Sequence, residues 1–432
     1  MIKLNREVLK GEFSRNIITL FSGNGLGQMF NLIGTLFVYT QFYSATQFGY
    51  LAIYMSIASI LSVIATARYE QAVVLPKEKI DGFHVLILSL LTVVLFSLAI
   101  FILLLAIMWY YPDLIYIKEL GKVSYLIPLS ILFFGSYQSI NFWMIRNKKY
   151  KVISLSKMLE GASVFVVTSA LGILFAYEFG LIIGFVAGQL VSFAVLFTHF
   201  LKTDRSDFDF ISLQNVRSMA SQYINFPKYN LPQVFIDMFQ KYGSVFIIER
   251  FFGYSVLGNY HLVYRVLRGP VGLVGMAFSQ VFYQKTSEIY SRGEDVYGLL
   301  KKSVVGLSTY SLPMFAILFF IVPGIFDLIL GAGYEESGTI AQILIPWIAF
   351  NFISSPISAF PQILNRQKTF LFITTIGNFS SLAMLFIISM NSANYFWPLF
   401  FYSGTMFLSM VYIIYWNLAI AKNARAELPD IE

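Results

Sequence analysis

The sequence predicts an all-α, polytopic membrane protein in which twelve transmembrane helices form two six-helix lobes around a central cationic cavity. Its composition, its distribution of positive charge and a weak internal repeat all indicate this fold class. Of the 432 residues, 57% are hydrophobic and only 12% are charged, whereas a soluble domain carries about 25% charged residues. Because about 20 apolar residues cross a bilayer as one helix, the chain has enough of them for about twelve crossings.

Apolar runs separated by charge or turn signals predict the individual spans. Only residues 177–179 separate the fifth run from the sixth, and we expect a tight hairpin there because one unbroken helix would exceed the hydrocarbon core. The first apolar stretch, residues 16–42, is too long for a signal-peptide core and is expected to remain as the first span. The predicted spans cover residues 17–42, 47–67, 83–109, 124–145, 159–177, 180–201, 232–250, 257–283, 302–325, 339–361, 370–390 and 395–420.

Lysine and arginine positions predict how these spans are oriented. The N-terminal segment and every second loop after it hold 24 of the 30 Lys and Arg residues. This count places Lys157 in the loop before the fifth span. Because cytoplasmic loops concentrate positive residues, both termini are predicted to be cytoplasmic.

The longest polar connection divides the predicted spans into two groups of six. We expect an N-terminal lobe over residues 1–201, a cytoplasmic linker over 202–231 and a C-terminal lobe with a short cytoplasmic tail over 232–432. Residues 212–226 of the linker are predicted to form an amphipathic helix at the membrane surface. Residues 42–49 and 251–258 resemble each other at an offset of 209, and an even number of spans per half predicts a parallel repeat.

The sequence gives no support to cofactor-dependent or nucleotide-dependent chemistry. Cysteine is absent, which excludes disulfides and Cys-based zinc sites, and His84, His199 and His261 are too scattered to indicate a metal site. No P-loop of the form GxxxxGKS or GxxxxGKT occurs. The net charge of +7 lies mostly in short loops, which favours membrane topology over nucleic-acid binding. We therefore predict no cofactor, no metal and no nucleic-acid partner.

Four charged residues are predicted to lie deep inside the seventh and eighth spans. Asp237 and Lys241 lie at i,i+4 on the seventh span, and Arg265 and Arg268 lie at i,i+3 on the eighth. A charge near the bilayer midplane is costly and normally faces a partner or a wet cavity. Three cations against one acid predict an anion site, and arginine suits phosphate because its planar fork donates two parallel hydrogen bonds. The alternative is that Asp237 pairs with Lys241 while the arginines bind helix-end carbonyls or snorkel.

Two further pairs of polar residues, Asn24 with Gln28 and Arg68 with Glu70, can each be interpreted in more than one way. Gly23 and Gly27 form a GxxxG pair on the first span, which favours close helix packing. Asn24 and Gln28 lie on one face of that span and are expected to hydrogen-bond a sugar.

At the end of the second span, Arg68 and Glu70 are either an interfacial anchor or a pair that receives a lipid headgroup.

The Gly269-Pro270 pair predicts a kink beside Arg268, and Pro346, Pro356 and Pro361 are predicted to break the tenth span. Deformable helices around one charged cavity favour alternating access over a fixed pore. The abundant Tyr and Phe side chains are expected to face lipid or the membrane interface, and no chemistry is assigned to them.

Several segments of the chain resemble the Wzx-type polysaccharide flippases. The resemblance implies membership of the multidrug/oligosaccharidyl-lipid/polysaccharide (MOP) exporter superfamily, two six-helix lobes that form a V-shaped, cation-lined cavity, and movement of undecaprenyl-diphosphate-linked oligosaccharides to the periplasmic leaflet. It implies lumen roles for Arg265 and Arg15, whereas the roles of Lys241 and Arg268 depend on their depth in the membrane. His261 stands where relatives often have a small residue. The matching stretches are residues 14–16, 48–52, 68–76, 257–265, 269–270 and 280–282.

These observations predict a non-enzymatic flippase of the bacterial inner membrane that moves an O-antigen or a similar surface polysaccharide unit. Its expected partners are the lipid-linked oligosaccharide, membrane lipids, and a polysaccharide polymerase with its chain-length machinery. A cation-coupled multidrug exporter of the same fold is the first alternative, but the first two spans contain no acid before Glu70. A membrane polymerase or ligase is the second, although the largest predicted external loop, residues 110–123, contains no histidine.

Overall fold

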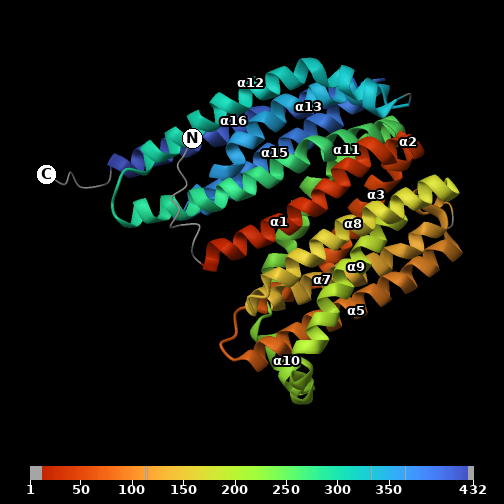
Figure 1. Ribbon diagram of the computed structural model, residues 1–432, viewed down its shortest axis with the longest axis vertical. Coiled ribbons are helices and arrows are strands. Elements are labelled where there is room, and N and C mark those ends of the chain that lie inside the picture. The colour runs from red at the N-terminus through yellow and green to blue at the C-terminus, as the bar shows by residue number, and fades with distance from the viewer. Residues whose placement is uncertain (1–11, 112, 114, 332, 365, 427–432) are drawn as a thin grey trace. The chain divides into compact units, whose positions relative to one another are not determined.

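The computed structural model describes residues 12–111, 113, 115–331, 333–364 and 366–426, and its regular structure there is helical. The helices divide into two compact units (Figure 1). The first consists of Met1–Tyr43 and Gln47–Val245, and the second of Ser44–Thr46 and Phe246–Glu432. The division into lobes at residues 201 and 231 that the sequence suggests stays a prediction.

The first unit begins with α1, which continues through a π-helical turn, and it ends within α11. Long helices follow one another through short turns, and the short α10 packs against α5 at one end of the bundle (Figure 1). The elements are α1 (Glu12–Ile33), η1 (Gly34–Tyr39), α2 (Thr40–Phe42), α3 (Ala45–Ala65), α4 (Tyr69–Ala72), α5 (Lys79–Tyr110), α6 (Ile115–Leu120), η2 (Gly121–Tyr125), α7 (Leu126–Arg146), α8 (Tyr150–Phe175), α9 (Gly180–Thr203), η3 (Arg205–Phe210), α10 (Leu213–Gln222), η4 (Phe226–Asn230) and the start of α11 (Leu231–Ser291).

The second unit contains the remainder of α11 and the four long helices that follow it. Within it, α13 packs between α12 and α16, and α15 lies against α16 (Figure 1). The tenth predicted span breaks at Pro356 and Pro361, as expected, while Pro346 remains inside a helix. The elements are α12 (Val296–Leu330), α13 (Glu335–Ser354), η5 (Ser355–Ile357), α14 (Phe360–Ile363), α15 (Gln367–Ser389) and α16 (Phe396–Ala426).

Nine of the described helical segments are long and apolar enough to cross a membrane. They match nine of the twelve predicted spans, and the hairpin between the fifth and sixth lies between Phe175 and Gly180. The other three predicted spans fall on α1 with its extension and on α11. The total of twelve stays a prediction. The nine segments are Ala45–Ala65, Lys79–Tyr110, Lys118–Arg146, Tyr150–Phe175, Gly180–Thr203, Val296–Leu330, Glu335–Ile363, Gln367–Ser389 and Phe396–Asn423.

Helix α11 breaks at Gly253, between the seventh and eighth predicted spans. Gly253 has φ 78° and ψ 178°, a conformation that only glycine adopts readily. A second break occurs at Tyr43, where the chain is extended with φ −122° and ψ 136°. Each of the two segments that resemble each other thus contains one break. Helical dihedral angles continue through Pro270. The described break is at Gly253, and the kink at Gly269-Pro270 stays a prediction.

Lys157 lies inside a helix, which corrects its placement in a cytoplasmic loop. Helix α8 begins at Tyr150, earlier than predicted, and Lys157 is two turns along it. The Lys157 Nζ atom lies 2.8 Å from Glu160 Oε2 and 4.3 Å from the ring centroid of Tyr137 on α7. Lysine is a good helix former, so this charge does not end the helix, and the two neighbours stabilise its ammonium group.

Glycines hold α1 against α8, which confirms the close packing predicted for the GxxxG pair. A Cβ added at Gly23 would lie 2.2 Å from the backbone oxygen of Ser154, and one at Gly27 would lie 2.5 Å from that of Lys157. From the other side, a Cβ at Gly161 would lie 2.3 Å from the Gly27 oxygen. The two backbones approach so closely that no side chain fits between them.

We predict that Gly27→Ala destabilises the protein and that Gly25→Ala does not. The added methyl of Gly27→Ala would collide with helix backbone, which costs about 1–3 kcal/mol. No atom lies within 4 Å of a Cβ at Gly25, so Gly25→Ala should be neutral or slightly stabilising through its higher helix propensity. Thermal unfolding of the purified variants in detergent measures the difference. Equal melting temperatures for the two variants would contradict the described α1–α8 contact.

Candidate functional site

Arg268 is held by aromatic side chains within the second unit. Its guanidinium lies 5.2 Å from the ring centroid of Tyr264 and 5.9 Å from that of Trp347. Its Nη1 atom also donates a hydrogen bond to the Tyr264 hydroxyl. None of these described contacts is with an acid, so they restrain the orientation of Arg268 and leave its positive charge unneutralised.

The rings around Arg268 come from three helices and form one aromatic cluster, consisting of Tyr260, Tyr264, Trp347 and Tyr402. The ring centroids are 6.0 Å apart for Tyr260 and Tyr264, 6.0 Å for Tyr264 and Trp347, and 5.8 Å for Trp347 and Tyr402. Tyr260, Trp347 and Tyr402 are buried. Tyr260 and Tyr402 are therefore exceptions to the expectation that most Tyr and Phe side chains face lipid or the interface.

Part of this cluster carries a signal that can be read from the sequence. Tyr260, Tyr264 and Arg268 are spaced at i, i+4 and i+8, which places them on one face of a helix. Trp347 lies 79 residues after Arg268 on α13, and Tyr402 lies on α16. The spacing could have identified the tyrosines, whereas the tryptophan partner depends on how α13 packs against α11.

The other charged residues of the predicted anion site belong to two different units. In the first unit, Asp237 and Lys241 are exposed on α11. Asp237 interacts electrostatically with Arg68, and the Lys241 ammonium lies 4.9 Å from the ring centroid of Tyr242. In the second unit, Arg265 is half-buried and interacts with His261, one helical turn earlier. The gathering of these charges into one site stays a prediction.

Arg68 and Glu70 form an ion pair beside the end of α3. Arg68 Nη1 lies 3.0 Å from Glu70 Oε1, and Glu70 is fully buried. Burial raises the pKa of the Glu70 carboxyl, and the charge of Arg68 opposes this shift. Ala67 and Arg68 both have positive φ, and Tyr69 donates a hydrogen bond to the Ala220 carbonyl of α10. This local structure supports the anchor interpretation, while a role in receiving a lipid headgroup stays a prediction.

The remaining predicted site residues lie on α1. Asn24 is half-buried and Gln28 is exposed, and each directly follows a glycine that packs against α8. Arg15 belongs to α1, but its side chain lies outside the described part of the chain. Among the residues that the structure describes, no group of three His, Asp or Glu side chains is placed to hold a metal ion.

A protein-family model described as "Polysaccharide biosynthesis protein" matches residues 38–339, more than half of the chain. The chain belongs to this family. The predicted membership of a polysaccharide-biosynthesis family is thereby confirmed. Among curated proteins, none matches the sequence.

Solved structures share the fold of this chain at low sequence identity. The lipid II flippase MurJ, in an inward closed conformation, has a TM-score of 0.67 and 15% identity over 96% of this chain and 91% of its own. An inward-facing multidrug resistance MATE family transporter of the MOP superfamily has a TM-score of 0.65 and 11% identity over 93% and 96%. A MOP superfamily transporter from Pyrococcus furiosus has a TM-score of 0.58 and 13% identity. The match covers 98% of this chain and 99% of that transporter. The protein therefore has the multi-pass fold of these membrane transporters.

We predict that Arg68→Gln destabilises the protein increasingly as the pH rises. Below the ordinary Glu70 pKa of 4.5, the carboxyl is protonated in the folded and unfolded states, so loss of Arg68 matters little. Because burial raises the folded-state pKa and removal of Arg68 raises it further, stability is lost as the pH rises through this pKa. The loss should reach about 3 kcal/mol once Glu70 must ionise without its partner.

Thermal unfolding between about pH 5 and pH 8 tests this prediction. Lys118→Gln is the control, because its partner Asp113 is 85% exposed and exposed pairs contribute about 0–1 kcal/mol. A difference between Arg68→Gln and the parent protein that does not change with pH would contradict the assigned role of the pair.

Proposed function

We propose that this protein is a flippase that moves an undecaprenyl-diphosphate-linked oligosaccharide, such as an O-antigen or similar surface polysaccharide unit, from the cytoplasmic to the periplasmic leaflet. Transport proceeds by alternating access and involves no covalent step. Family membership supports a role in polysaccharide biosynthesis, and the fold shared with MurJ supports a lipid-linked substrate by analogy.

The arrangement around Arg268 is the observation that carries this proposal. Its guanidinium is restrained by the faces of Tyr264 and Trp347 and retains its positive charge. A diphosphate offers two adjacent anionic groups, and a guanidinium binds such groups through parallel, charge-assisted hydrogen bonds. A restrained side chain also loses less conformational entropy when the substrate arrives. The site therefore favours an anionic headgroup over a cationic drug.

The other predicted residues complete the proposed substrate contacts. Lys241, Arg265 and Arg15 add positive charge for the diphosphate, while Asn24 and Gln28 hydrogen-bond the sugars. Asp237 lies among these cations, and Arg68 and Glu70 act where the headgroup is received. These roles come from the sequence pattern and the family resemblance, within the proposed twelve-helix architecture with its central cationic cavity.

Membrane voltage can assist the proposed direction of transport. An anion that leaves a negative cell interior moves down the voltage by about 2.3 kcal/mol per charge per 100 mV. A diphosphate carries more than one negative charge, so the voltage alone would favour the periplasmic leaflet. This direction requires a bacterial inner-membrane location with both termini and the 202–231 connection in the cytoplasm, which we propose from the Lys and Arg distribution.

We predict that polysaccharide export decreases from wild type to Arg268→Lys to Arg268→Ala at equal protein levels in the membrane. Lysine keeps the charge but loses the planar fork, while alanine removes both. Loss of one charged contact to a phosphate should cost about 2–3 kcal/mol, or 30- to 150-fold in apparent affinity. Surface polysaccharide is measured by immunoblot in a strain that lacks the native gene.

Arg250→Ala is the matched control, because it removes the same charge from an exposed position of α11. It should leave export close to that of the wild type. Normal export by Arg268→Ala, with abundance and folding unchanged, would overturn the assigned site and favour the alternative in which the arginine only snorkels.

We predict that Ser206 is cytoplasmic, and that Ser44 and Asn391 face the periplasm. The natural chain has no cysteine, so single cysteines at these positions can be labelled with a membrane-impermeant maleimide in intact spheroplasts. Only Ser44→Cys and Asn391→Cys should react. Labelling of Ser206→Cys before the membrane is permeabilised would contradict the proposed topology.

A further inference from the structure

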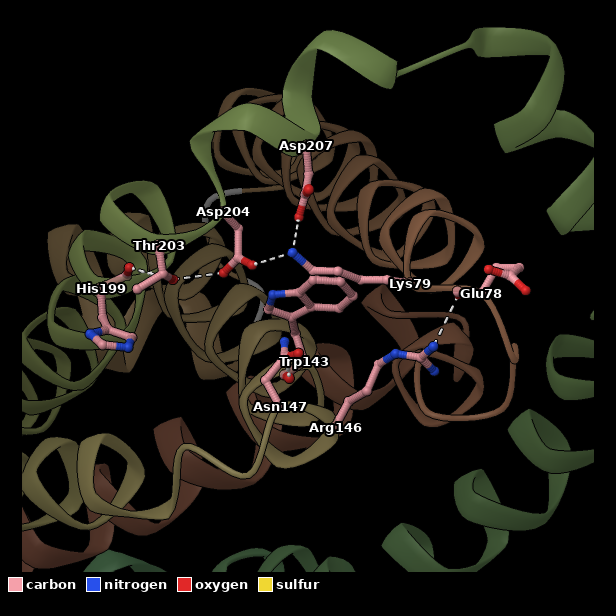
Figure 2. Close-up of polar contacts among 9 residues, drawn as sticks. All are labelled: Glu78, Lys79, Trp143, Arg146, Asn147, His199, Thr203, Asp204 and Asp207. Carbon is pink, nitrogen blue, oxygen red and sulfur yellow. Dashed lines mark hydrogen bonds and ion pairs between the residues drawn. The ribbon is translucent and has the colours of Figure 1, made fainter.

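The connection after α9 is fixed to the start of α5 by two acidic residues. Lys79 Nζ lies 3.2 Å from Asp204 Oδ1 and 2.6 Å from Asp207 Oδ2 (Figure 2). The same ammonium lies 5.9 Å from the ring centroid of Trp143. Phe208 adds an edge-to-face contact with Phe83 at 5.2 Å between ring centroids. Asp204 and Asp207 therefore both pair with Lys79, and the ring of Phe208 packs against that of Phe83.

This attachment leaves basic side chains on the outer side of the same short segment. Lys202 and Arg205 are exposed, whereas Asp204 is buried and Asp207 is half-buried. A groove of about 930 Å³ lies here, and Asp209 is the acid that lines it. Two cations and one acid therefore line the groove. The lining residues are Leu201, Lys202, Arg205, Ser206, Phe208 and Asp209.

The groove lies where α9 reaches the membrane surface. Helix α9 has 24 residues and is therefore about 36 Å long, which exceeds the hydrocarbon core of about 30 Å. Its last turn must then reach the level of the lipid headgroups. Leu190, Thr198 and Leu201 are exposed along this helix, and Leu201 also lines the groove, so apolar surface and positive charge meet there.

Exposed apolar side chains flank the groove on the linker side. Phe210, the last residue of η3, is 65% exposed, and Leu213, the first residue of α10, is 79% exposed. Large apolar side chains beside basic residues at headgroup level are typical of surfaces that insert into the lipid interface. A soluble protein partner would not require this combination at the end of a membrane span.

We propose that this groove binds the headgroup of an anionic phospholipid, with Lys202 and Arg205 contacting the phosphate. The guanidinium of Arg205 donates parallel hydrogen bonds to phosphate oxygens. Leu201, Phe208 and Phe210 contact the glycerol and the upper acyl chain. The bound lipid fixes the linker at the membrane surface, in addition to the Lys79 ion pairs. This site is separate from Arg268 and does not depend on the proposed substrate.

Lipid binding to the purified, full-length protein tests the proposal. Phosphatidylglycerol or phosphatidylcholine is added to wild type and to the double variant Lys202→Gln/Arg205→Gln, and bound lipid is counted by mass spectrometry of the intact protein. Wild type should bind phosphatidylglycerol in preference to phosphatidylcholine. The double variant should bind phosphatidylglycerol roughly thirtyfold more weakly, because each basic residue near an anionic lipid surface contributes about a factor of five.

Controls separate this site from general electrostatic attraction. Lys301→Gln/Lys302→Gln removes two exposed charges from α12 and should bind phosphatidylglycerol as the wild type does. Arg205→Lys keeps the charge and should bind with intermediate affinity, which preserves the test if the double variant folds poorly. Unchanged phosphatidylglycerol binding by the folded double variant would overturn the proposal. Equal competition by soluble glycerol phosphate would also overturn it, because the site would then recognise free phosphate.

Discussion

The bilayer imposes one constraint on the charged residues that lie within it, because a charge in hydrocarbon needs a stabilising neighbour. The described residues satisfy this constraint in two ways. Glu70 is stabilised by Arg68, and Lys157 by Glu160, so these charges are paired with opposite charges. Arg268 is stabilised by the ring faces of Tyr264 and Trp347. The first arrangement neutralises the charge, whereas the second does not.

This difference separates structural charges from a charge that is available to a ligand. An arginine paired with a carboxylate would have to exchange that partner for a phosphate, and the carboxylate would then be left without its cation. An arginine on aromatic rings gains the phosphate without losing an ionic partner. The rings also restrict the rotamers of the guanidinium before the ligand arrives. Under the proposed function, the aromatic cluster orients Arg268 for an anion, whereas Lys157 is already paired with Glu160.

Local patterns in the sequence predicted the features that depend on neighbouring residues. Apolar run length identified nine described spans, and the GxxxG pair of Gly23 and Gly27 identified the face of α1 that packs against α8. Patterns could not identify partners that are distant in sequence. Trp347 meets Arg268 only because α13 packs against α11, and Lys157 meets Tyr137 only because α7 lies beside α8. Likewise, the sequence predicted the segment that contains Asp204 and Asp207 only as part of a linker.

Fold alone does not select the substrate, because a lipid II flippase and a multidrug transporter resemble this chain about equally well. The family match and the charge at Arg268 favour a lipid diphosphate. The most direct test reconstitutes the purified protein in liposomes with a fluorescent polyprenyl-diphosphate oligosaccharide and follows its movement between leaflets by quenching from outside. We predict that the protein makes the inner-leaflet lipid accessible to the quencher. A membrane potential of the favourable sign should increase the rate of this movement. Transport of a cationic drug without movement of the lipid diphosphate would contradict it.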